Sequence, residues 1–257
     1  MRTFLRMAYE IRNWLPVALT RMGWLSARPH RFIDFRRGCR IAFRGNGDWV
    51  TVYELFLGDT YQDLFQALRR HREGGVVLDL GGNIGCFALR VAEESPSLRV
   101  ISFEPGPPNA RLFEASLAAN PEAARRIELR MEAVGGEEGE ANWFFEEENH
   151  GASSLHTGKG VPYRVKVSSL ARIIGELREP VAAIKIDIEG AEYELLERTP
   201  PEVWDKIDLI ALELHQDPSG RTDPNGFLGR MQDLGYAVRA DSSSSYFLTR
   251  KPPTSAS

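Results

Sequence analysis

The 257-residue sequence is short of cysteine, of net positive charge and of long apolar runs, and each shortage excludes a class of protein. Its two cysteines, Cys39 and Cys86, are too few for a secreted disulfide scaffold and are not spaced as a pair of metal ligands. The formal net charge of −4 gives no overall attraction to nucleic acid. No apolar stretch reaches transmembrane length, and the first residues lack the apolar core and cleavage site of a signal peptide. We therefore expect a cytoplasmic protein without a nucleic-acid partner.

What the sequence does contain is an ordinary globular composition and an informative pair of segments. With 42% hydrophobic and 26% charged residues, the chain suits one large α/β domain with an appendage. Residues 76–85 read Val-Val-Leu-Asp-Leu-Gly-Gly-Asn-Ile-Gly, and residues 101–105 read Ile-Ser-Phe-Glu-Pro. An apolar strand, a glycine-rich turn, a helix and a second strand that ends in an acid form the layout of a nucleoside-binding βαβ unit.

The glycine spacing distinguishes between two nucleoside ligands. A dinucleotide pattern G-x-G-x-x-G begun at Gly81 would need glycine at positions that hold Asn83 and Cys86. The shorter pattern Asp-x-Gly-x-x-x-Gly is met by Asp79, Gly81 and Gly85. Pyrophosphate binds to open backbone N–H groups at a helix start, whereas S-adenosylmethionine carries an ammonium and a sulfonium. An acid two residues before the first glycine favours that cationic ligand.

A third segment makes the pattern more specific, because residues 184–192 read Ile-Lys-Ile-Asp-Ile-Glu-Gly-Ala-Glu. Together with residues 79–85 and 103–105, it resembles the FkbM family of S-adenosylmethionine-dependent methyltransferases. The likeness covers roughly residues 50–250 and departs from many methyltransferases at Asn83, where they carry glycine. The resemblance implies S-adenosyl-L-methionine as the cofactor and sugars or polyketide-like natural products as acceptors.

The alternation of apolar strands and amphipathic helices predicts a doubly wound, mostly parallel α/β sheet. Strands are expected at 76–80, 99–103, 127–131, 182–187 and 207–214, with helices at 84–94, 108–119, 190–197 and 223–234. Residues 236–239 and 246–250 predict a terminal antiparallel hairpin, which the resemblance also implies. The resemblance further implies a Rossmann-like class I methyltransferase fold with a seven-stranded sheet. We divide the chain into an N-terminal extension of helix and short strands (1–50), a methyltransferase domain (51–251) and a disordered tail (252–257).

The N-terminal residues 4–25 mix apolar side chains with arginines, which predicts a basic helical segment bent near Pro16. Two interpretations are open for it. It contacts a membrane surface or a greasy substrate, or it packs across the main domain or against a second subunit of a homodimer. The packing interpretation is favoured because the aromatic residues lie on more than one face of the helix.

Between this segment and the glycine turn, short elements are expected. Strands are predicted at 31–34 and 40–44, joined by a turn at Gly38, and at 51–53. A helix capped by Asp59 or Thr60 should then run to about Arg72.

Residues 132–160 interrupt the alternation of strands and helices. Two acidic runs are predicted to lie on a solvated surface, with an added strand at 143–145 between them. Residues 150–160 are rich in Gly, Ser and Thr and should form a mobile loop near the site, where His150 and His156 are further candidate bases. We expect residues 1–75 and 135–165 to form the acceptor pocket.

Ligands of open α/β sheets bind at the carboxyl ends of the strands, and several polar residues are expected at these ends. Asp79 should hold the cofactor ammonium, directly or through water. Glu104, followed by Pro105, should accept hydrogen bonds from both ribose hydroxyls. Glu132 and Ala133 are placed to flank the adenine ring. Gly81, Asn83 and Gly85 complete the turn, where a side chain on either glycine would block close approach of the ligand.

Candidate catalytic residues are expected beside this cofactor site. Asp187 and Glu189 end the fourth core strand, which suggests general-base work or metal binding. For Glu189 the alternative is a cap on the helix that opens at Gly190. His215 is the best single base candidate, because the intrinsic pKa of histidine lies near working pH. We expect proton removal to be the role of these residues and no metal to be obligatory.

These residues predict O-methylation of a hydroxyl on a small molecule or glycan, with alignment and a general base as the contributions of the protein. Two alternatives remain open. One is an NAD-dependent oxidoreductase, which the glycine spacing disfavours. The other is a non-catalytic nucleoside-binding or scaffold module.

Overall fold

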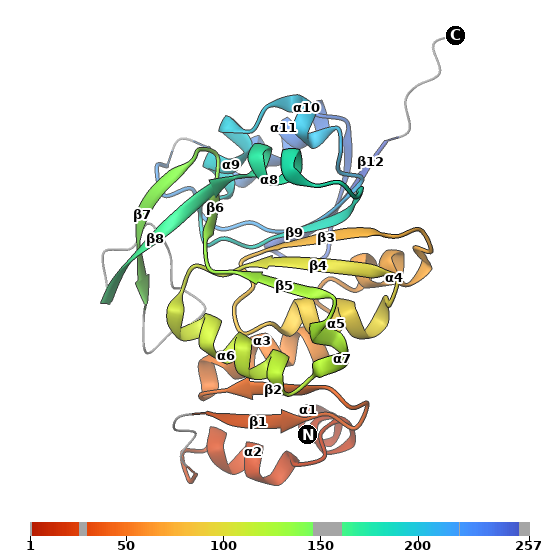
Figure 1. Cartoon of the computed structure of the whole chain (residues 1–257), viewed down its shortest axis with the longest axis vertical. Helices are drawn as coiled ribbons and strands as arrows, with labels where there is room; N and C mark the ends of the chain where they lie inside the picture. Colours follow the sequence, from red (N-terminus) through yellow and green to blue (C-terminus); the bar gives the residue numbers. More distant parts are fainter. Residues whose placement is uncertain (1, 26–29, 146–160, 221, 252–257) are drawn as a thin grey trace.

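A seven-stranded sheet forms the centre of the computed structural model, which describes residues 2–25, 30–145, 161–220 and 222–251 (Figure 1). The strands follow the order β11 (Tyr236–Ala240), β12 (Ser245–Arg250), β10 (Leu209–Glu213), β9 (Val181–Ile186), β3 (Gly75–Leu80), β4 (Leu98–Phe103), β5 (Ile127–Arg130). From β10 to β5 neighbouring strands are parallel, and β12 runs antiparallel to both β10 and β11. The Rossmann-like class I methyltransferase fold and its terminal hairpin are therefore confirmed.

Helices cover both faces of this sheet because alternate side chains of each central strand point to opposite faces. Val77 joins one core with helices α4 (Gln62–Arg70), α5 (Cys86–Glu94) and α6 (Pro107–Ala118), and with the short α7 (Pro121–Ala124) beside them. Val76 and Leu78 join the other core, with α8 (Leu170–Glu176), α9 (Glu192–Arg198), α10 (Pro201–Trp204) and α11 (Pro224–Asp233). Figure 1 shows these two groups of helices below and above the sheet. Burial on both faces explains why β3 and β9 are almost continuously apolar.

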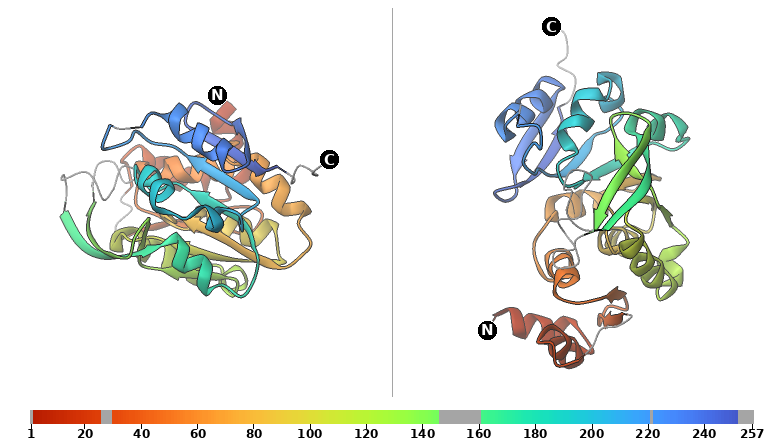
Figure 2. Two further views of the ribbon diagram at one scale, coloured as in Figure 1. Left: turned by 90° about the horizontal axis from the view of Figure 1, so that it is seen from above. Right: turned by 90° about the vertical axis from the view of Figure 1, so that its left-hand side faces the viewer.

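The N-terminal segment lies at one end of the molecule, as Figure 2 also shows. It comprises helices α1 (Arg2–Glu10) and α2 (Trp14–Arg21) and the antiparallel strands β1 (Arg31–Asp34) and β2 (Arg40–Phe43). The two strands confirm the prediction, but the predicted bend at Pro16 is wrong. The helix breaks before Asn13, whose amide donates to Phe32 O over 2.7 Å and accepts from the Asp34 N–H over 2.9 Å. Pro16 lies in the first turn of α2, where its missing N–H costs little.

One side of this N-terminal segment packs onto the main domain and another side is exposed. Met7, Ile11 and Val17 are buried in the same core as Val77, and β2 is tied to α6 by the Ser116 hydroxyl, which accepts from the Ala42 N–H. Exposed apolar side chains remain at Leu5, Tyr9, Leu15, Met22 and Trp24. Contact with a membrane surface or a second subunit therefore stays a prediction. In the described part of the chain, no helix is long and apolar enough to cross a membrane.

Two predictions for the segment before β3 are wrong. Residues 51–53 are helical, because α3 (Asn46–Val52) continues directly into the π-helical turn η1 (Tyr53–Leu57). Burial of Trp49, Val52 and residues 55–57 outweighs the strand preference of the Thr-Val-Tyr sequence. Helix α4 begins at Gln62 without a side-chain cap, since Tyr61 precedes it in a left-handed conformation. The predicted boundary after residue 50 falls inside α3.

A second, three-stranded sheet lies beside the main one and contains β6 (Ala133–Gly135), β8 (Val161–Ser169) and β7 (Gly139–Phe145) in that order. The strand predicted at 143–145 is confirmed as the end of β7. Strand β8 was not predicted, although Val161, Val165 and Val167 show a period-two pattern typical of a strand. His150, His156 and the rest of the predicted loop lie outside the described residues.

Candidate active site

The carboxyl ends of β3, β9 and β10 meet at a cavity of about 300 Å³, which lies at the lower end of the range for small-molecule sites. Its walls come from the turn after β3, from the ends of β9 and β10 and from the segment between α3 and α4. The lining residues are Gly47, Val50, Thr51, Glu54, Leu55, Thr60, Tyr61, Gly81, Gly82, Asn83, Phe87, Lys185, Asp187, Glu189 and Glu213.

The glycine turn after β3 is shaped by close backbone approach. Gly81 has φ +86°, and a Cβ there would lie 1.8 Å from the Asp187 carbonyl oxygen. Gly85 has φ +89°, and a Cβ there would collide with the Phe113 ring at 2.3 Å. The predicted need for glycine is thus met, but the groups that a side chain would strike belong to β9 and α6. The turn therefore packs tightly against the backbone at Asp187 on one side and against the Phe113 ring on the other.

Glu104 lies at the end of β4 and is buried, with only 4% of its surface exposed. Its carboxylate accepts from the Asn83 N–H and the Gly106 N–H, each over 2.8 Å, and from the Asn109 amide over 3.3 Å. Burial raises the pKa of Glu104 to about 7, although these hydrogen bonds act in the opposite direction. A carboxylate offers about four acceptor positions. Glu104 is not among the residues that line the cavity, but Asn83, which donates to it, is. Contact between Glu104 and a ribose therefore stays a prediction.

Asp79 is not brought to the cavity as predicted. Its side chain is fully buried, accepts from the Ser102 hydroxyl over 2.6 Å and lies 3.5 Å from the Lys185 ammonium. Lys185, rather than Asp79, lines the cavity, and its ammonium also contacts Asp187 over 3.1 Å and donates to Gly81 O over 2.6 Å. The ammonium that lies beside Asp79 is therefore that of Lys185. Because Asp79 is fully buried behind Lys185, the predicted direct contact between Asp79 and the cofactor ammonium is not available.

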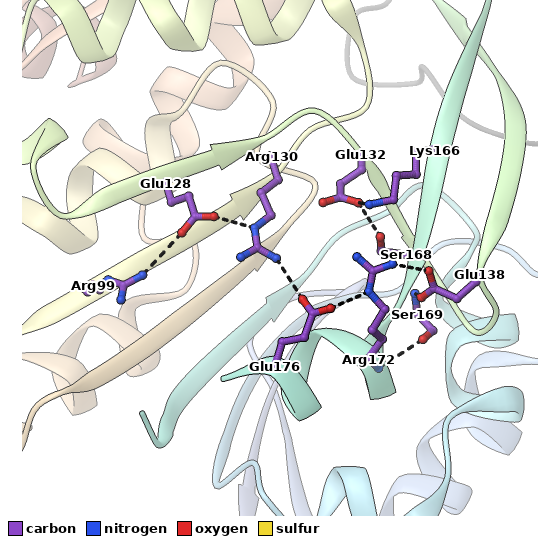
Figure 3. Close-up of polar contacts among 10 residues, drawn as sticks. All are labelled: Arg99, Glu128, Arg130, Glu132, Glu138, Lys166, Ser168, Ser169, Arg172 and Glu176. Atoms are coloured by element: carbon purple, nitrogen blue, oxygen red, sulfur yellow. Dashed lines mark hydrogen bonds and ion pairs between the residues drawn. The ribbon is translucent and has the colours of Figure 1, made fainter. Parts of the chain in front are cut away.

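Glu132 and Ala133 follow β5, but the Glu132 side chain turns away from the glycine turn. Its carboxylate accepts from the Ser168 hydroxyl and pairs with Lys166 of β8, as Figure 3 shows. Burial would raise the pKa of Glu132, but the contacts with Lys166 and Ser168 lower it overall. Because the Glu132 carboxylate is engaged with β8, only the backbone of this segment and Ala133 could contact the adenine ring.

Ion pairs extend from this point between the smaller sheet and helix α8 of the main domain (Figure 3). Arg172 on α8 bridges Glu138 over 2.7 Å and Glu176 over 2.9 Å. Of the predicted solvated acids, Glu137, Glu138 and Glu140 are indeed exposed, but each is paired with an arginine. Single exposed pairs of this kind contribute little to stability.

Three acids, Asp187, Glu189 and Glu213, lie close together at the ends of β9 and β10. Burial, followed by the charge of Asp187, raises the pKa of Glu189 to about 8 and that of Glu213 to about 7. The same two causes raise the pKa of Glu54 on η1. The Tyr61 hydroxyl donates to Glu213 Oε2 over 3.2 Å. Glu54, Glu189 and Glu213 thus hold protons more firmly than free carboxylates do.

His215 lies next to this group, with its ring fixed between two acids. Its Nδ1 is 3.0 Å from Glu192 Oε1, and its Nε2 is 3.5 Å from Glu189 Oε2. Burial alone would lower the pKa of His215, but the hydrogen bond and charge of Glu192 and the charge of Glu189 raise it to about 9. The pKa of His215 thus lies above the intrinsic value on which its candidacy as a base rested. His215 is also not among the residues that line the cavity.

Glu192 holds the loop after β9, and this role removes the capping alternative for Glu189. The buried Glu192 carboxylate accepts from the Ile188 N–H over 3.0 Å and from the Gly190 N–H over 2.9 Å. Glu189 makes no capping bond and adopts φ +55°, a conformation uncommon for a residue with a side chain. Its carboxylate is directed toward His215 instead of a helix end.

One set of side chains in the described residues could hold a cation. One ligand atom from each of Asp187, Glu189 and His215 lies within 4.8 Å of the other two. The sequence had suggested metal binding by Asp187 and Glu189 as an alternative to general-base work, and the structure brings His215 beside these two acids.

Sequence reasoning missed four residues around the site. Tyr61 and Glu54 precede the sequence motifs. Glu54 lies in the π-helical η1 and Tyr61 in the connection to α4, and neither segment has a periodic pattern. Glu192 stands inside the third motif, yet only the folded loop reveals its three partners. Trp143 of β7 packs on the turn after Glu104, where a Cβ on Gly106 would lie 2.2 Å from its ring.

Several known proteins resemble this chain. A family model described as the methyltransferase FkbM domain matches residues 79–238. The AMB antimetabolite synthetase AmbE of Pseudomonas aeruginosa is 26% identical over 258 residues, a match that covers 81% of this chain and 12% of that protein. Methyltransferase 1 of Beauveria bassiana is 26% identical over 160 residues, covering 54% of this chain and 64% of the relative. The chain thus spans less than two thirds of the length of these relatives.

Solved structures were also compared. The methyltransferase FkbM from Methylobacillus flagellatus has 15% identity and a TM-score of 0.48, over 68% of this chain and 43% of that chain. A precorrin-6y C5,15-methyltransferase from Geobacter metallireducens has 12% identity and a TM-score of 0.44, over 76% and 89% of the two chains.

Proposed function

Because the chain belongs to the FkbM family of methyltransferases, we propose that it transfers the methyl group of S-adenosylmethionine to a hydroxyl of a sugar, glycan or polyketide-like small molecule. Methyl transfer as such follows from the family. The kind of acceptor is inferred from the residues of the site. The observation that carries the hydroxyl acceptor is the pair of carboxylates, Asp187 and Glu213, that ends β9 and β10 and lines the cavity beside the glycine turn.

The residues around the turn fit a nucleoside cofactor. Gly81 and Gly82 leave backbone open on the cavity side. Behind Asn83, the Glu104 carboxylate retains acceptor capacity for ribose hydroxyls. The buried Asn83 Oδ1 has no hydrogen-bond partner and lies in a residue that lines the cavity. When bound there, S-adenosylmethionine supplies an electrophilic methyl group on a sulfonium. The protein aligns the acceptor oxygen with that group, a contribution that reaches about 7–11 kcal/mol in favourable cases.

The acceptor hydroxyl loses its proton during transfer, and Glu213 is placed to receive it. Glu213 faces the cavity, and the Tyr61 hydroxyl fixes one of its oxygens. Its pKa of about 7, raised by burial and by Asp187, suits a base that works near neutral pH. His215 is the weaker candidate, since its ring lies outside the cavity lining and its pKa of about 9 keeps it protonated. Asp187 remains a second candidate, with Lys185 holding one of its oxygens.

The proposal is tested by incubating the purified protein with S-adenosylmethionine carrying an isotopically labelled methyl group and a panel of sugars and polyketide-like alcohols. Label should appear as an ether in at least one alcohol, together with S-adenosylhomocysteine. A product labelled only at nitrogen or carbon would contradict O-methylation, and no label in any acceptor would favour the non-catalytic alternative. The oxidoreductase alternative is set aside by the family match.

A further inference from the structure

The cavity has an excess of negative charge that its own residues do not balance. Glu54, Asp187, Glu189 and Glu213 line it, and Lys185 is the one Lys or Arg in that lining. The Lys185 ammonium is shared between Asp187 over 3.1 Å and the buried Asp79 over 3.5 Å. Glu189 faces His215, whereas Glu54 and Glu213 form no ion pair among the described residues. The place of the cavity is fixed independently of these acids, by the glycine turn and the strand ends.

The backbone that carries Glu54 is held in place by contacts of the surrounding turn. In the π-helical η1 an additional residue widens the helix, a feature frequent at functional sites. The Arg90 guanidinium is buried beneath the turn and donates to the Leu55 carbonyl oxygen. Gly58 then passes so close that a Cβ there would lie 2.8 Å from the Glu54 carbonyl oxygen. These contacts fix the backbone at Glu54, and its exposed side chain lies in the wall of the cavity.

The cofactor alone does not neutralise these groups. S-adenosylmethionine carries two positive charges and one negative charge, and its sulfonium charge disappears when the methyl group leaves. With four carboxylates and a single ammonium in the lining, the acids still repel one another when the cofactor is bound. A further cationic group in the cavity would relieve this repulsion.

We propose that the acceptor carries a protonated amine beside the hydroxyl that is methylated, and that Glu54 binds this ammonium. The inference rests on the proposed function and specifies its acceptor as an amino alcohol, of which an amino sugar is the simplest sugar form. Transfer leaves the amine unchanged: the hydroxyl oxygen gains the methyl group, its proton passes to Glu213, and the C–S bond electrons stay on sulfur. Glu54 precedes residue 79, where the family match begins, so the family does not determine this contact.

A divalent cation is the competing occupant, and the positions of the acids disfavour it as the partner of Glu54. The ligand atoms that converge belong to Asp187, Glu189 and His215, and neither Glu54 nor Glu213 shares their meeting point. An ammonium, which donates in three directions, suits separated carboxylates better than a metal ion with short bonds.

The test compares D-glucosamine with N-acetyl-D-glucosamine, which has the same ring but an uncharged amide. Isothermal titration calorimetry measures binding of each sugar to the full chain saturated with S-adenosylhomocysteine, near neutral pH and at low salt. Glucosamine should bind about tenfold more tightly or better, as expected for one close charge pair. In Glu54→Gln this preference should largely disappear, and in Glu54→Asp it should partly return, while affinity for S-adenosylhomocysteine stays the same. The exposed Glu128→Gln serves as the matched control and should keep the preference.

Equal binding of the two sugars, or a preference that Glu54→Gln leaves intact, would overturn the inference. Titration with Mg²⁺ provides the other arm: binding of Mg²⁺ that disappears in Glu54→Gln would assign the carboxylate to a metal and likewise overturn it. Failure of S-adenosylhomocysteine to bind the wild-type chain would instead contradict the proposed function, so the two failures are distinguishable.

Discussion

The Tyr61 hydroxyl donates a hydrogen bond to Glu213 Oε2 over 3.2 Å and thereby joins two residues that lie 152 positions apart. Tyr61 belongs to the connection before α4, and Glu213 ends β10. This contact closes one side of the cavity and orients a carboxylate toward its interior. We therefore propose Glu213, in place of His215, as the proton acceptor.

Glu213→Gln should lower turnover by about 10²–10⁴-fold, because a general base that acts in the transition state is lost while the shape of the side chain is kept. Affinity for S-adenosylhomocysteine should remain nearly unchanged. Steady-state kinetics and calorimetry measure the two quantities. Tyr61→Phe should give a smaller loss and an altered pH profile. Full turnover in Glu213→Gln would return the role to Asp187 or His215.

Gly81→Ala should destabilise the fold and weaken cofactor binding. A Cβ at this position would lie 1.8 Å from the Asp187 carbonyl oxygen, and the φ of +86° is unfavourable for alanine. Gly175→Ala is the matched control, since it lies in α8 with nothing within 4 Å and should be neutral or slightly stabilising. Thermal unfolding compares the two variants. Equal melting temperatures would contradict the close approach between the glycine turn and β9.

Stability should fall as pH rises toward alkaline values, in part through His215. Burial lowers the pKa of this histidine, but Glu192 and Glu189 raise it overall from 6.5 to about 9. A pKa raised in the folded state adds stability that is fully present below pH 6.5 and is lost as pH rises through about 9. His215→Gln should therefore be less stable than wild type at pH 6, by on the order of 1–3 kcal/mol. The difference should vanish above pH 9, as urea unfolding at several pH values would reveal; a difference that grows with pH would contradict the assignment.

Removal of divalent metal should leave methyl transfer intact. Asp187, Glu189 and His215 could hold a cation, but the proposed proton transfer needs only Glu213 and the aligned acceptor. Activity measured after dialysis against EDTA should equal that of the untreated protein. Activity that EDTA abolishes and Mg²⁺ restores would instead assign these three residues to a metal centre.

The sheet and the cofactor turn could be predicted because their determinants are local. Apolar strands such as residues 76–80 are buried on both faces, and the spacing from Asp79 to Gly85 is set by a single turn. The position of Glu104 beside that turn also follows, since the parallel strands β3 and β4 must end at the same edge.

The partners of the polar residues could not be predicted, because they depend on contacts between distant segments. Asp79 was expected to meet a ligand ammonium, yet Lys185 from the neighbouring strand occupies that place. The pKa of His215 depends on its contact with Glu192, which lies 23 residues earlier in the chain. Residues 51–53 have the composition of a strand. They form a helix because the helical conformation buries Trp49 and Val52 in the core.

The most direct test of the central claim is the binding of S-adenosylhomocysteine and NAD to the wild-type chain and to Glu104→Ala. Calorimetry should detect S-adenosylhomocysteine binding to the wild type and none for NAD. Glu104→Ala should lose about 1.5–3 kcal/mol of binding free energy for each ribose hydrogen bond that it removes. Binding of NAD without S-adenosylhomocysteine, or unchanged affinity in Glu104→Ala, would contradict the account of this cavity as the site of S-adenosylmethionine-dependent methyl transfer.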